Sequence, residues 1–276
     1  KPTIQHRASL VFRGGLSDNI SGNDSGYFSG KLKNVEKIIP VMPMDEEENS
    51  QYTANVVNEF LDEVYKVLDK HPVNIKRREK GLLPANYLLV RGPGIEIPKL
   101  KLYRNWVSLA YMPLEIGFSK LSGMKTVSFN YPRLVNLDSY KNLHEGLEKA
   151  CKYAIKVLKK HKQRSEYAYL HIKETDLPGH DNKPLEKKEM LEYVDKTLFK
   201  FLRNFIPQNK IKLVVTADHA TPCRLKSHSD DPVPVMFYND SPPRPEVKFC
   251  ERTARTGRMG RIMGRDLLKK VGFVKG

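Results

Sequence analysis

The second half of the chain alternates short apolar runs with longer amphipathic stretches. The apolar runs are typical of buried strands and cover residues 107–112, 126–130, 167–172, 211–217 and 234–238. The stretches between them place apolar residues at helical spacing and predict helices over 113–122, 140–161 and 185–205, with a last helix near 260–270. Strands separated by helices of this length indicate parallel pairing with right-handed crossovers. We therefore predict an α/β fold with a mixed or parallel sheet flanked by helices.

The first part of the chain carries a weaker pattern of the same kind. Residues 7–13 and 86–91 are apolar enough to predict strands, and an amphipathic helix is expected from about Asp45 to Leu68. Glycine and proline residues at 92–98 indicate a boundary between about 94 and 104. We expect a smaller α/β domain over residues 1–96 and a larger domain over residues 97–276.

Two loops that follow predicted strands carry residue types that bind metals. One loop contains Asp176 and His180, and the other contains Asp218, His219 and His228. The carboxyl ends of strands are where ligands bind in open α/β sheets, and both loops are expected at the same edge of one sheet. Mixed carboxylate and imidazole ligands suit Mn²⁺, Zn²⁺ or Fe²⁺, and two such groups could hold a pair of ions on a phosphoryl group. A single loop Asp or His is more often a turn former or a cap, but two such loops behind buried strands favour a metal site.

The chain is strongly basic, with a formal net charge of +16. Much of the excess lies in amphipathic stretches such as 149–162 and 183–200, where lysines alternate with apolar residues as on a solvated helix face. Zinc-finger spacing and runs of nucleic-acid-binding aromatics are absent from the sequence, so we do not expect a nucleic-acid partner.

The apolar runs and the cysteines indicate where in the cell the protein is expected. No apolar run approaches the roughly twenty residues that cross a bilayer, and the chain does not open with a signal-like segment. The three cysteines are widely spaced and odd in number, which favours free thiols in a reducing compartment. We therefore expect no membrane span and a cytoplasmic location.

Several stretches resemble one enzyme family. The runs HIKETDLPGHD and VVTADHATPCRLKSHSDDPVPV are similar to the metal-binding loops of the archaeal-type, cofactor-independent phosphoglycerate mutases, which belong to the alkaline phosphatase superfamily. HPVNIKRREKGLLPAN resembles part of the family's second domain, and TGRMGRIMGRDLL resembles its closing segment. The resemblance extends from His6 to about Leu268.

The resemblance implies a fold, a reaction and two ions. The larger domain would be alkaline-phosphatase-like, and residues 1–96 would form part of a cap over the substrate. Two divalent ions (Mn, Zn, Mg or Co) would assist conversion of 3-phosphoglycerate to 2-phosphoglycerate in glycolysis and gluconeogenesis. By position, one ion would be held by Asp176, His180 and His228, and the other by Asp218 and His219.

Substrate contacts are expected from four residues of the first domain, namely Arg13, Asp18, Arg77 and Arg91. Arg13 and Arg91 each lie at the end of a predicted strand. Each could bind a carboxylate or phosphate in a bidentate manner, with two hydrogen bonds. An ordinary surface role for both arginines is the alternative. The ligand would be phosphoglycerate or a similar small phosphorylated anion.

The chain also departs from the family pattern. The family's N-terminal segment, with an Asp-Gly metal ligand and the nucleophilic Ser, should precede His6 and is not in this sequence. Asn19 and Ile116 stand where an arginine and a lysine are expected. Two functions remain open: a mutase completed by an N-terminal segment or a partner chain, and a non-catalytic, mutase-derived subunit with a structural or interaction role. In either case we expect exposed apolar surface or an unpaired sheet edge, which favours association.

Overall fold

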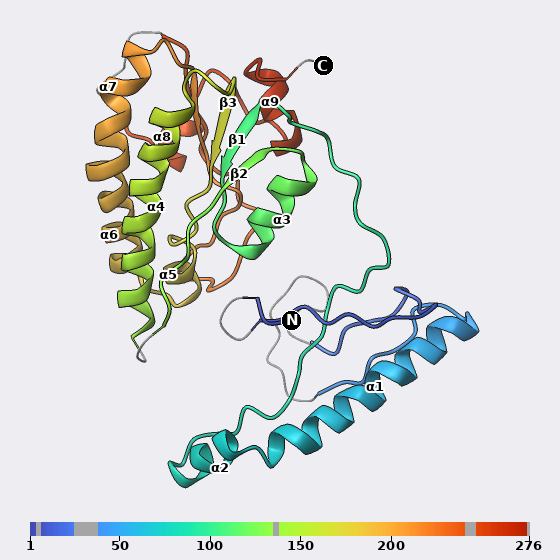
Figure 1. The fold of residues 1–276 in the computed structure, drawn as a ribbon. Helices are drawn as coiled ribbons and strands as arrows, with labels where there is room; N and C mark the ends of the chain where they lie inside the picture. The colour runs from blue at the N-terminus through green and yellow to red at the C-terminus, as the bar shows by residue number, and fades with distance from the viewer. Residues whose placement is uncertain (4–6, 25–37, 135–137, 241–246, 275–276) are drawn as a thin grey trace. The chain divides into compact units, whose positions relative to one another are not determined.

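The computed structural model describes residues 1–3, 7–24, 38–134, 138–240 and 247–274 (Figure 1). The chain divides into two compact units. The N-terminal unit comprises Lys1 and Ala8–Lys99, and the C-terminal unit comprises Pro2–Arg7 and Leu100–Gly276. Among the described residues, no helix combines the length and the apolar character that crossing a membrane requires. The three cysteines are free thiols.

The C-terminal unit is built on a parallel three-stranded sheet. Its strands are β1 (Trp106–Leu109), β2 (Lys125–Val127) and β3 (Tyr167–Leu170), in the order β2-β1-β3. All four residues of β1 are buried, as expected for a central strand. The connections are α3 (Pro113–Leu121) and α4 (Ser139–His161), which lie on opposite sides of the sheet (Figure 1). The predicted α/β architecture with flanking helices is confirmed.

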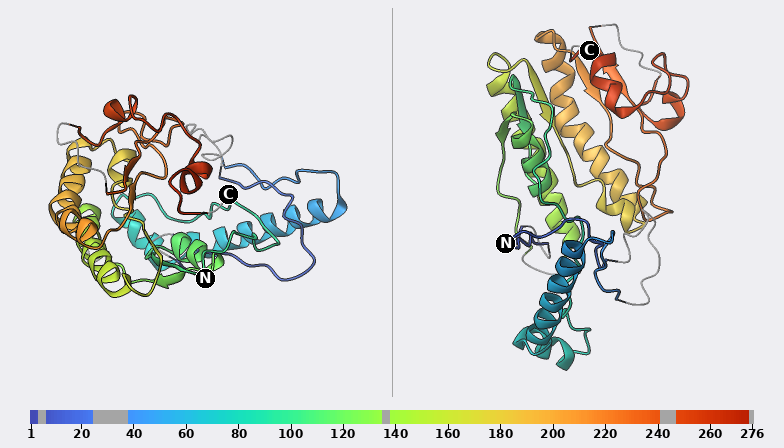
Figure 2. Two further views of the ribbon diagram at one scale, coloured as in Figure 1. Left: turned by 90° about the horizontal axis from the view of Figure 1, so that it is seen from above. Right: turned by 90° about the vertical axis from the view of Figure 1, so that its right-hand side faces the viewer.

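One side of this sheet is covered by α4 and by a long helical stretch that runs beside it (Figures 1 and 2). That stretch consists of α6 (Pro184–Val194), a π-helical turn (Asp195–Phe199) and α7 (Lys200–Gln208). The core between these layers contains Val107 and Leu109 of β1, Leu147, Ala150, Cys151, Ala154 and Val157 of α4, and Met190, Val194, Leu198, Leu202, Phe205 and Ile206 of the long stretch. The spacing of the α4 residues is that of one helix face, so burial of this face explains why the segment is helical.

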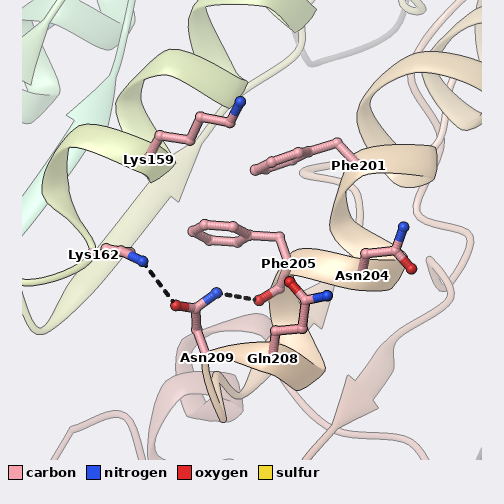
Figure 3. A pocket seen from close by; sticks show the side chains of 7 residues that line it. All are labelled: Lys159, Lys162, Phe201, Asn204, Phe205, Gln208 and Asn209. Carbon is pink, nitrogen blue, oxygen red and sulfur yellow. Dashed lines mark hydrogen bonds between the residues drawn. The ribbon is translucent and has the colours of Figure 1, made fainter.

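Lysines at the C-terminal end of α4 contact the neighbouring helical stretch: Lys159 lies in the last turn of α4, and Lys162 follows it directly. Lys159 Nζ lies 5.4 Å from the centre of the Phe201 ring, and Lys162 Nζ donates to Asn209 Oδ1 over 3.2 Å. Figure 3 shows both lysines facing the residues of α7 across a surface recess. Part of the basic excess therefore belongs to solvated helix faces, where the lysine stems cover apolar surface.

Strands β4 (Leu213–Val215) and β5 (Met236–Tyr238) form a separate antiparallel pair. The prediction that both metal loops leave the same sheet is therefore wrong, because β3 and β4 belong to different hydrogen-bonded sheets. The connection after β4 explains its own pairing: the chain returns directly to β5 through a loop closed by an Ala220–Ser229 bridge, which gives an antiparallel pair. The long helical stretch separates β3 from β4, and these two strands form no ladder with each other among the described residues.

The end of the chain contains short helices in place of one longer helix. They are α8 (Glu251–Ala254), a 3₁₀ turn (Gly264–Asp266) and α9 (Leu267–Lys270). The helix predicted near 260–270 therefore occupies only the second half of that range.

The N-terminal unit contains α1 (Glu48–Asp69) and α2 (Pro72–Glu79). The helix expected from 45 to 68 is confirmed. His71 caps α2, because its ring nitrogen accepts a hydrogen bond from Val73 N over 3.2 Å. The buried core of this unit consists of Val41, Ala54, Val57 and Leu61.

The two strands predicted in this unit are not formed. Residues 7–13 contain only an isolated bridge at Ala8, and residues 86–91 have no regular secondary structure. Among the described residues, the segment 86–91 has no neighbouring strand to pair with and forms hydrogen bonds with the side chain of Asn23. Asn23 Nδ2 donates to Leu88 O over 3.0 Å, and Asn23 Oδ1 accepts from Val90 N over 2.7 Å. These hydrogen bonds satisfy the backbone of an extended segment without a ladder.

Candidate metal centre

The loops that follow β3 and β4 are packed against each other. The first loop leads into the short helix α5 (Leu177–His180), and the second carries Asp218 to His228. A Cβ atom added at Gly179 would lie only 2.6 Å from Thr221 O, so the two backbones approach as closely as a glycine allows. Lys187 of α6 donates to the same carbonyl over 2.8 Å and holds the second loop from the side.

Three of the predicted ligands converge on one point. His180 Nε2 and His228 Nε2 are 3.1 Å apart, and they lie 3.5 and 3.7 Å from Asp176 Oδ1. Nitrogen ligands at 2.0–2.1 Å around a tetrahedral Zn²⁺ would be separated by about 3.3 Å. The observed separations therefore have the size that a shared cation requires.

The other two predicted ligands border this trio. The rings of His219 and His228 have centroids 3.7 Å apart, because the Ala220–Ser229 bridge folds the loop back on itself. Asp218 Oδ2 lies 3.4 Å from His219 Nε2. The structure thus brings all five predicted residues into one cluster, which we call the metal centre: Asp176, His180, Asp218, His219 and His228.

Hydrogen bonds to the remote ring nitrogens indicate which histidine atoms are free to bind. His180 Nδ1 lies 3.1 Å from Lys226 O, a carbonyl that can only accept. The Nδ1 atom therefore carries the proton, and Nε2 presents a lone pair to the cluster. His219 Nδ1 lies 3.1 Å from Thr221 Oγ1, whose own proton is donated to Asp176 Oδ1 over 2.7 Å. His219 is oriented in the same way, and such outer partners are characteristic of metal-binding histidines.

The surroundings of Asp176 and His228 favour the protonation states in which these side chains can bind a metal ion. Burial alone would raise the pKa of Asp176, but the Thr221 hydrogen bond and the nearby positive charge of Lys173 contribute to a net lowering. Burial and the neighbouring His219 lower the pKa of His228. An ionised carboxylate and a neutral imidazole are the forms that coordinate divalent ions.

The structure adds residues that the sequence did not single out. His171 Nε2 lies 3.6 Å from Asp218 Oδ2, and Lys173 Nζ lies 3.7 Å from Asp176 Oδ2. Both belong to the loop after β3, so their place in that loop was an available signal. Thr221 had no comparable signal, because its role depends on contacts between the two loops.

Glu174 is a buried acid two residues before Asp176 of the metal centre. It is 1% exposed, and its Oε2 atom accepts from Tyr111 OH over 2.8 Å and from Lys173 N over 3.1 Å. Burial raises the pKa of Glu174 despite the Tyr111 hydrogen bond. These contacts connect the loop after β3 to Tyr111, which follows β1, and fix the backbone that leads to Asp176.

The four residues predicted to contact substrate all lie in the N-terminal unit. Asp18 Oδ2 accepts from Ile95 N over 3.3 Å, Arg77 Nε donates to Leu83 O over 2.8 Å, and Arg91 lies 3.7 Å from Asp24. Arg13 is exposed. Their role in substrate binding stays a prediction.

The two departures from the family pattern lie in different units. Asn19, which stands in place of an expected arginine, donates to the carboxylate of Asp45. Ile116, which stands in place of an expected lysine, lies on α3.

Comparison with known proteins agrees with the resemblance seen in the sequence. The model of the metalloenzyme superfamily matches residues 119–272, and the model of the 2,3-bisphosphoglycerate-independent phosphoglycerate mutases matches residues 1–74. The mutase of Picrophilus torridus is 33% identical over 98% of this chain and 63% of its own length. Mutase 1 of Archaeoglobus fulgidus is 36% identical over 95% of this chain and 61% of its own length.

A solved structure extends the comparison to the fold. The PH0037 protein of Pyrococcus horikoshii superposes with a TM-score of 0.63 and 27% identity, over 83% of this chain and 60% of that one. The chain thus spans less than two thirds of each of these three proteins. Its similarity to 2,3-bisphosphoglycerate-independent phosphoglycerate mutases is confirmed by the two relatives and the family model. Since the superfamily match covers more than half of the sequence and contains every residue of the metal centre, the chain belongs to the metalloenzyme superfamily.

Proposed function

We propose that the metal centre holds two divalent ions and serves phosphoryl transfer between 3-phosphoglycerate and 2-phosphoglycerate. The observation that carries this proposal is the convergence of Asp176 Oδ1, His180 Nε2 and His228 Nε2 within 3.1 to 3.7 Å of one another. Asp218 and His219 lie next to this trio and are assigned to the second ion. The donor set suits Mn²⁺, Zn²⁺, Co²⁺ or Mg²⁺.

The chain's own residues prepare the site for this chemistry. When bound, the two ions would activate a hydroxyl nucleophile and spread the charge of the transferring phosphoryl group. Thr221 orients His219 and Asp176 together, and Lys226 O orients His180. Lys173 places a positive charge 3.7 Å from Asp176, where a phosphate bound at the centre would meet it.

The substrate is an anion of high charge, and two features support its binding. The net charge of +16 attracts anions over a distance. Arg13, Asp18, Arg77 and Arg91 are proposed to bind phosphoglycerate from the N-terminal unit, with the nucleophile supplied by an N-terminal segment or a partner chain. A reaction of glycolytic intermediates would be carried out in the cytoplasm.

Metal binding is tested first, by elemental analysis after equilibrium dialysis of untagged protein against Mn²⁺ or Zn²⁺. We expect His180→Ala and His228→Ala to lower the affinity for the first ion by at least about tenfold, and His219→Ala to do so for the second. His71→Asn is the matched control, since asparagine can also cap α2. Retention of full metal content by His180→Ala and His228→Ala would contradict the proposal.

Turnover is tested by coupling to enolase in Mn²⁺ or Co²⁺, with the chain joined to the part of a relative that it does not span. Activity that is lost on His219→Ala supports the mutase function. Tight metal binding without any activity would support the alternative, a non-catalytic, mutase-derived subunit.

A further inference from the structure

A second group of metal-binding residue types lies between two helices, apart from the metal centre. His144 of α4 faces Glu186 and Glu189 of α6, and these helices are neighbours in the C-terminal unit (Figure 1). One ligand atom from each of the three residues lies within 4.8 Å of the others. We call these three residues the interhelical cluster.

The two glutamates of the cluster lack the partners expected in so basic a chain. Among the described residues, no Lys or Arg forms an ion pair with Glu186 or Glu189, although the net charge is +16. The adjacent lysines are engaged elsewhere: Lys187 Nζ donates to Thr221 O, and Lys188 Nζ pairs with Glu192. Two like charges three residues apart on a helix repel each other, so this arrangement favours a cation between them.

The geometry agrees with a small divalent ion. His144 Nε2 and Glu186 Oε2 are 3.3 Å apart, which matches the separation of about 3.3 Å between ligands at 2.0–2.1 Å around a tetrahedral Zn²⁺. The His144 and Glu186 side chains are 41% and 36% exposed, so solvent can reach the site. Three protein ligands with an open position for water form a recurrent zinc arrangement.

We propose that His144, Glu186 and Glu189 bind one Zn²⁺ that joins α4 to α6. The ion would take the place of the proton shared by His144 and Glu186 and would neutralise Glu189. It would connect the N-terminal halves of two helices that pack through Leu147 and Met190 on the core side. This site is independent of the phosphoryl-transfer site and of its ions.

Glu189 distinguishes this proposal from ordinary surface electrostatics. Glu186 lies in the first turn of α6, where the helix dipole favours a carboxylate, and its contact with His144 is an ordinary surface pair. Neither effect involves Glu189, which is exposed and has no ion pair among the described residues. A loss of Zn²⁺ affinity in Glu189→Gln would therefore indicate that Glu189 is a ligand of the shared ion.

The experiment measures Zn²⁺ binding by equilibrium dialysis of untagged protein that carries His180→Ala, His219→Ala and His228→Ala, so that both ion positions of the metal centre are impaired. We expect one Zn²⁺ per chain in this background, and an affinity at least about tenfold lower after His144→Gln or Glu189→Gln. Glu192→Gln is the matched control, because Glu192 lies on the same helix but pairs with Lys188 and Lys196.

A second readout is thermal unfolding of the otherwise unaltered chain with and without Zn²⁺. Zinc should raise the midpoint more in Glu192→Gln than in Glu189→Gln, because a ligand stabilises the state that binds it. Equal zinc affinity in Glu189→Gln and Glu192→Gln would overturn the proposal. Neither readout uses mutase activity, so failure here and failure of the proposed function are distinguishable.

Discussion

Gly179 controls how closely the two loops of the metal centre can approach. A Cβ atom at this position would meet Thr221 O at 2.6 Å and Thr221 Cγ2 at 2.8 Å, and backbone cannot give way as a flexible side chain can. Gly179→Ala must therefore displace the loop that carries His219 and His228 from the loop that carries Asp176 and His180.

We expect Gly179→Ala to lower divalent-metal affinity by about 10- to 100-fold and stability by about 1–3 kcal/mol. Metal titration and urea unfolding measure the two effects. Gly117→Ala is the control, because it lies within α3 with no atom within 4 Å of the added Cβ, and alanine there should be neutral or slightly stabilising. Unchanged metal affinity in Gly179→Ala would show that the loops do not need this close approach.

Glu174 gives a pH-dependent prediction. Its pKa is raised in the folded protein by burial, so the folded state holds its proton at a pH where the unfolded state has lost it. Stability from this group is therefore present below the ordinary glutamate pKa and is lost as pH rises through the folded value. Glu174→Gln keeps an acceptor for Tyr111 OH but does not ionise, so it should remove this loss. Urea unfolding of both proteins at pH 5 and pH 7.5 measures it, and identical pH slopes would contradict it.

At the residue scale, the sequence predicts which side chains can bind a metal but not which contacts hold them in place. Asp176, His180, Asp218, His219 and His228 stood out because each has a side chain that binds metals and follows an apolar run. Thr221 and Glu174 did not, because a hydroxyl that orients a histidine and an acid buried behind a loop depend on folded neighbours. The local pattern predicts ligands, whereas the residues that position them require the tertiary structure.

At the scale of elements, amphipathic helices were the most predictable feature. The helix expected over 140–161 is α4, since its apolar residues repeat at the spacing of one face and are buried together. Strands were less predictable, because an apolar run does not specify which other segment it will pair with by backbone hydrogen bonds. The segment 86–91 meets the side chain of Asn23 instead of a strand, and β4 pairs antiparallel with β5 through a direct return.

The importance of the α4 face can be measured at Leu147, which is fully buried in the core of the C-terminal unit. Leu147→Ala should destabilise this unit by about 2–5 kcal/mol, because it removes buried apolar surface and leaves a cavity. Leu185→Ala is the matched control, as this leucine of α6 is 73% exposed. Chemical denaturation of both variants tests the comparison, and equal losses would show that α4 does not contribute to the core as described.

At the scale of the whole molecule, composition constrained the function less than the two metal loops did. The charge of +16 is compatible with many anionic partners, and part of it covers helix faces such as that of α4. The metal loops, in contrast, led to one superfamily, which the match over residues 119–272 confirms. Which reaction the chain supports is a further question, since it spans only 61–63% of the mutases quoted above.

The reaction depends on a nucleophile as well as on metals. Phosphoryl transfer requires a hydroxyl in line with the phosphorus, and loss of the nucleophile alone removes orders of magnitude of rate. The hydroxyl of Thr221 is unsuited to this role, because the residue is 5% exposed and donates its proton to Asp176 Oδ1. The 276 residues alone should therefore bind divalent metal but form no phosphoenzyme and show no mutase turnover.

A chimaera with the part of the Archaeoglobus fulgidus mutase that this chain does not span tests the same point from the other side. In the enolase-coupled assay with Mn²⁺, it should exceed the 276-residue chain by at least about 10³-fold, and His219→Ala should abolish the gain because it removes a proposed metal ligand. Turnover by the chain alone would reveal a nucleophile among its own residues. A chimaera that binds metal without turnover would favour the non-catalytic function, and Asn19→Arg with Ile116→Lys would then test whether the altered substrate positions are the cause.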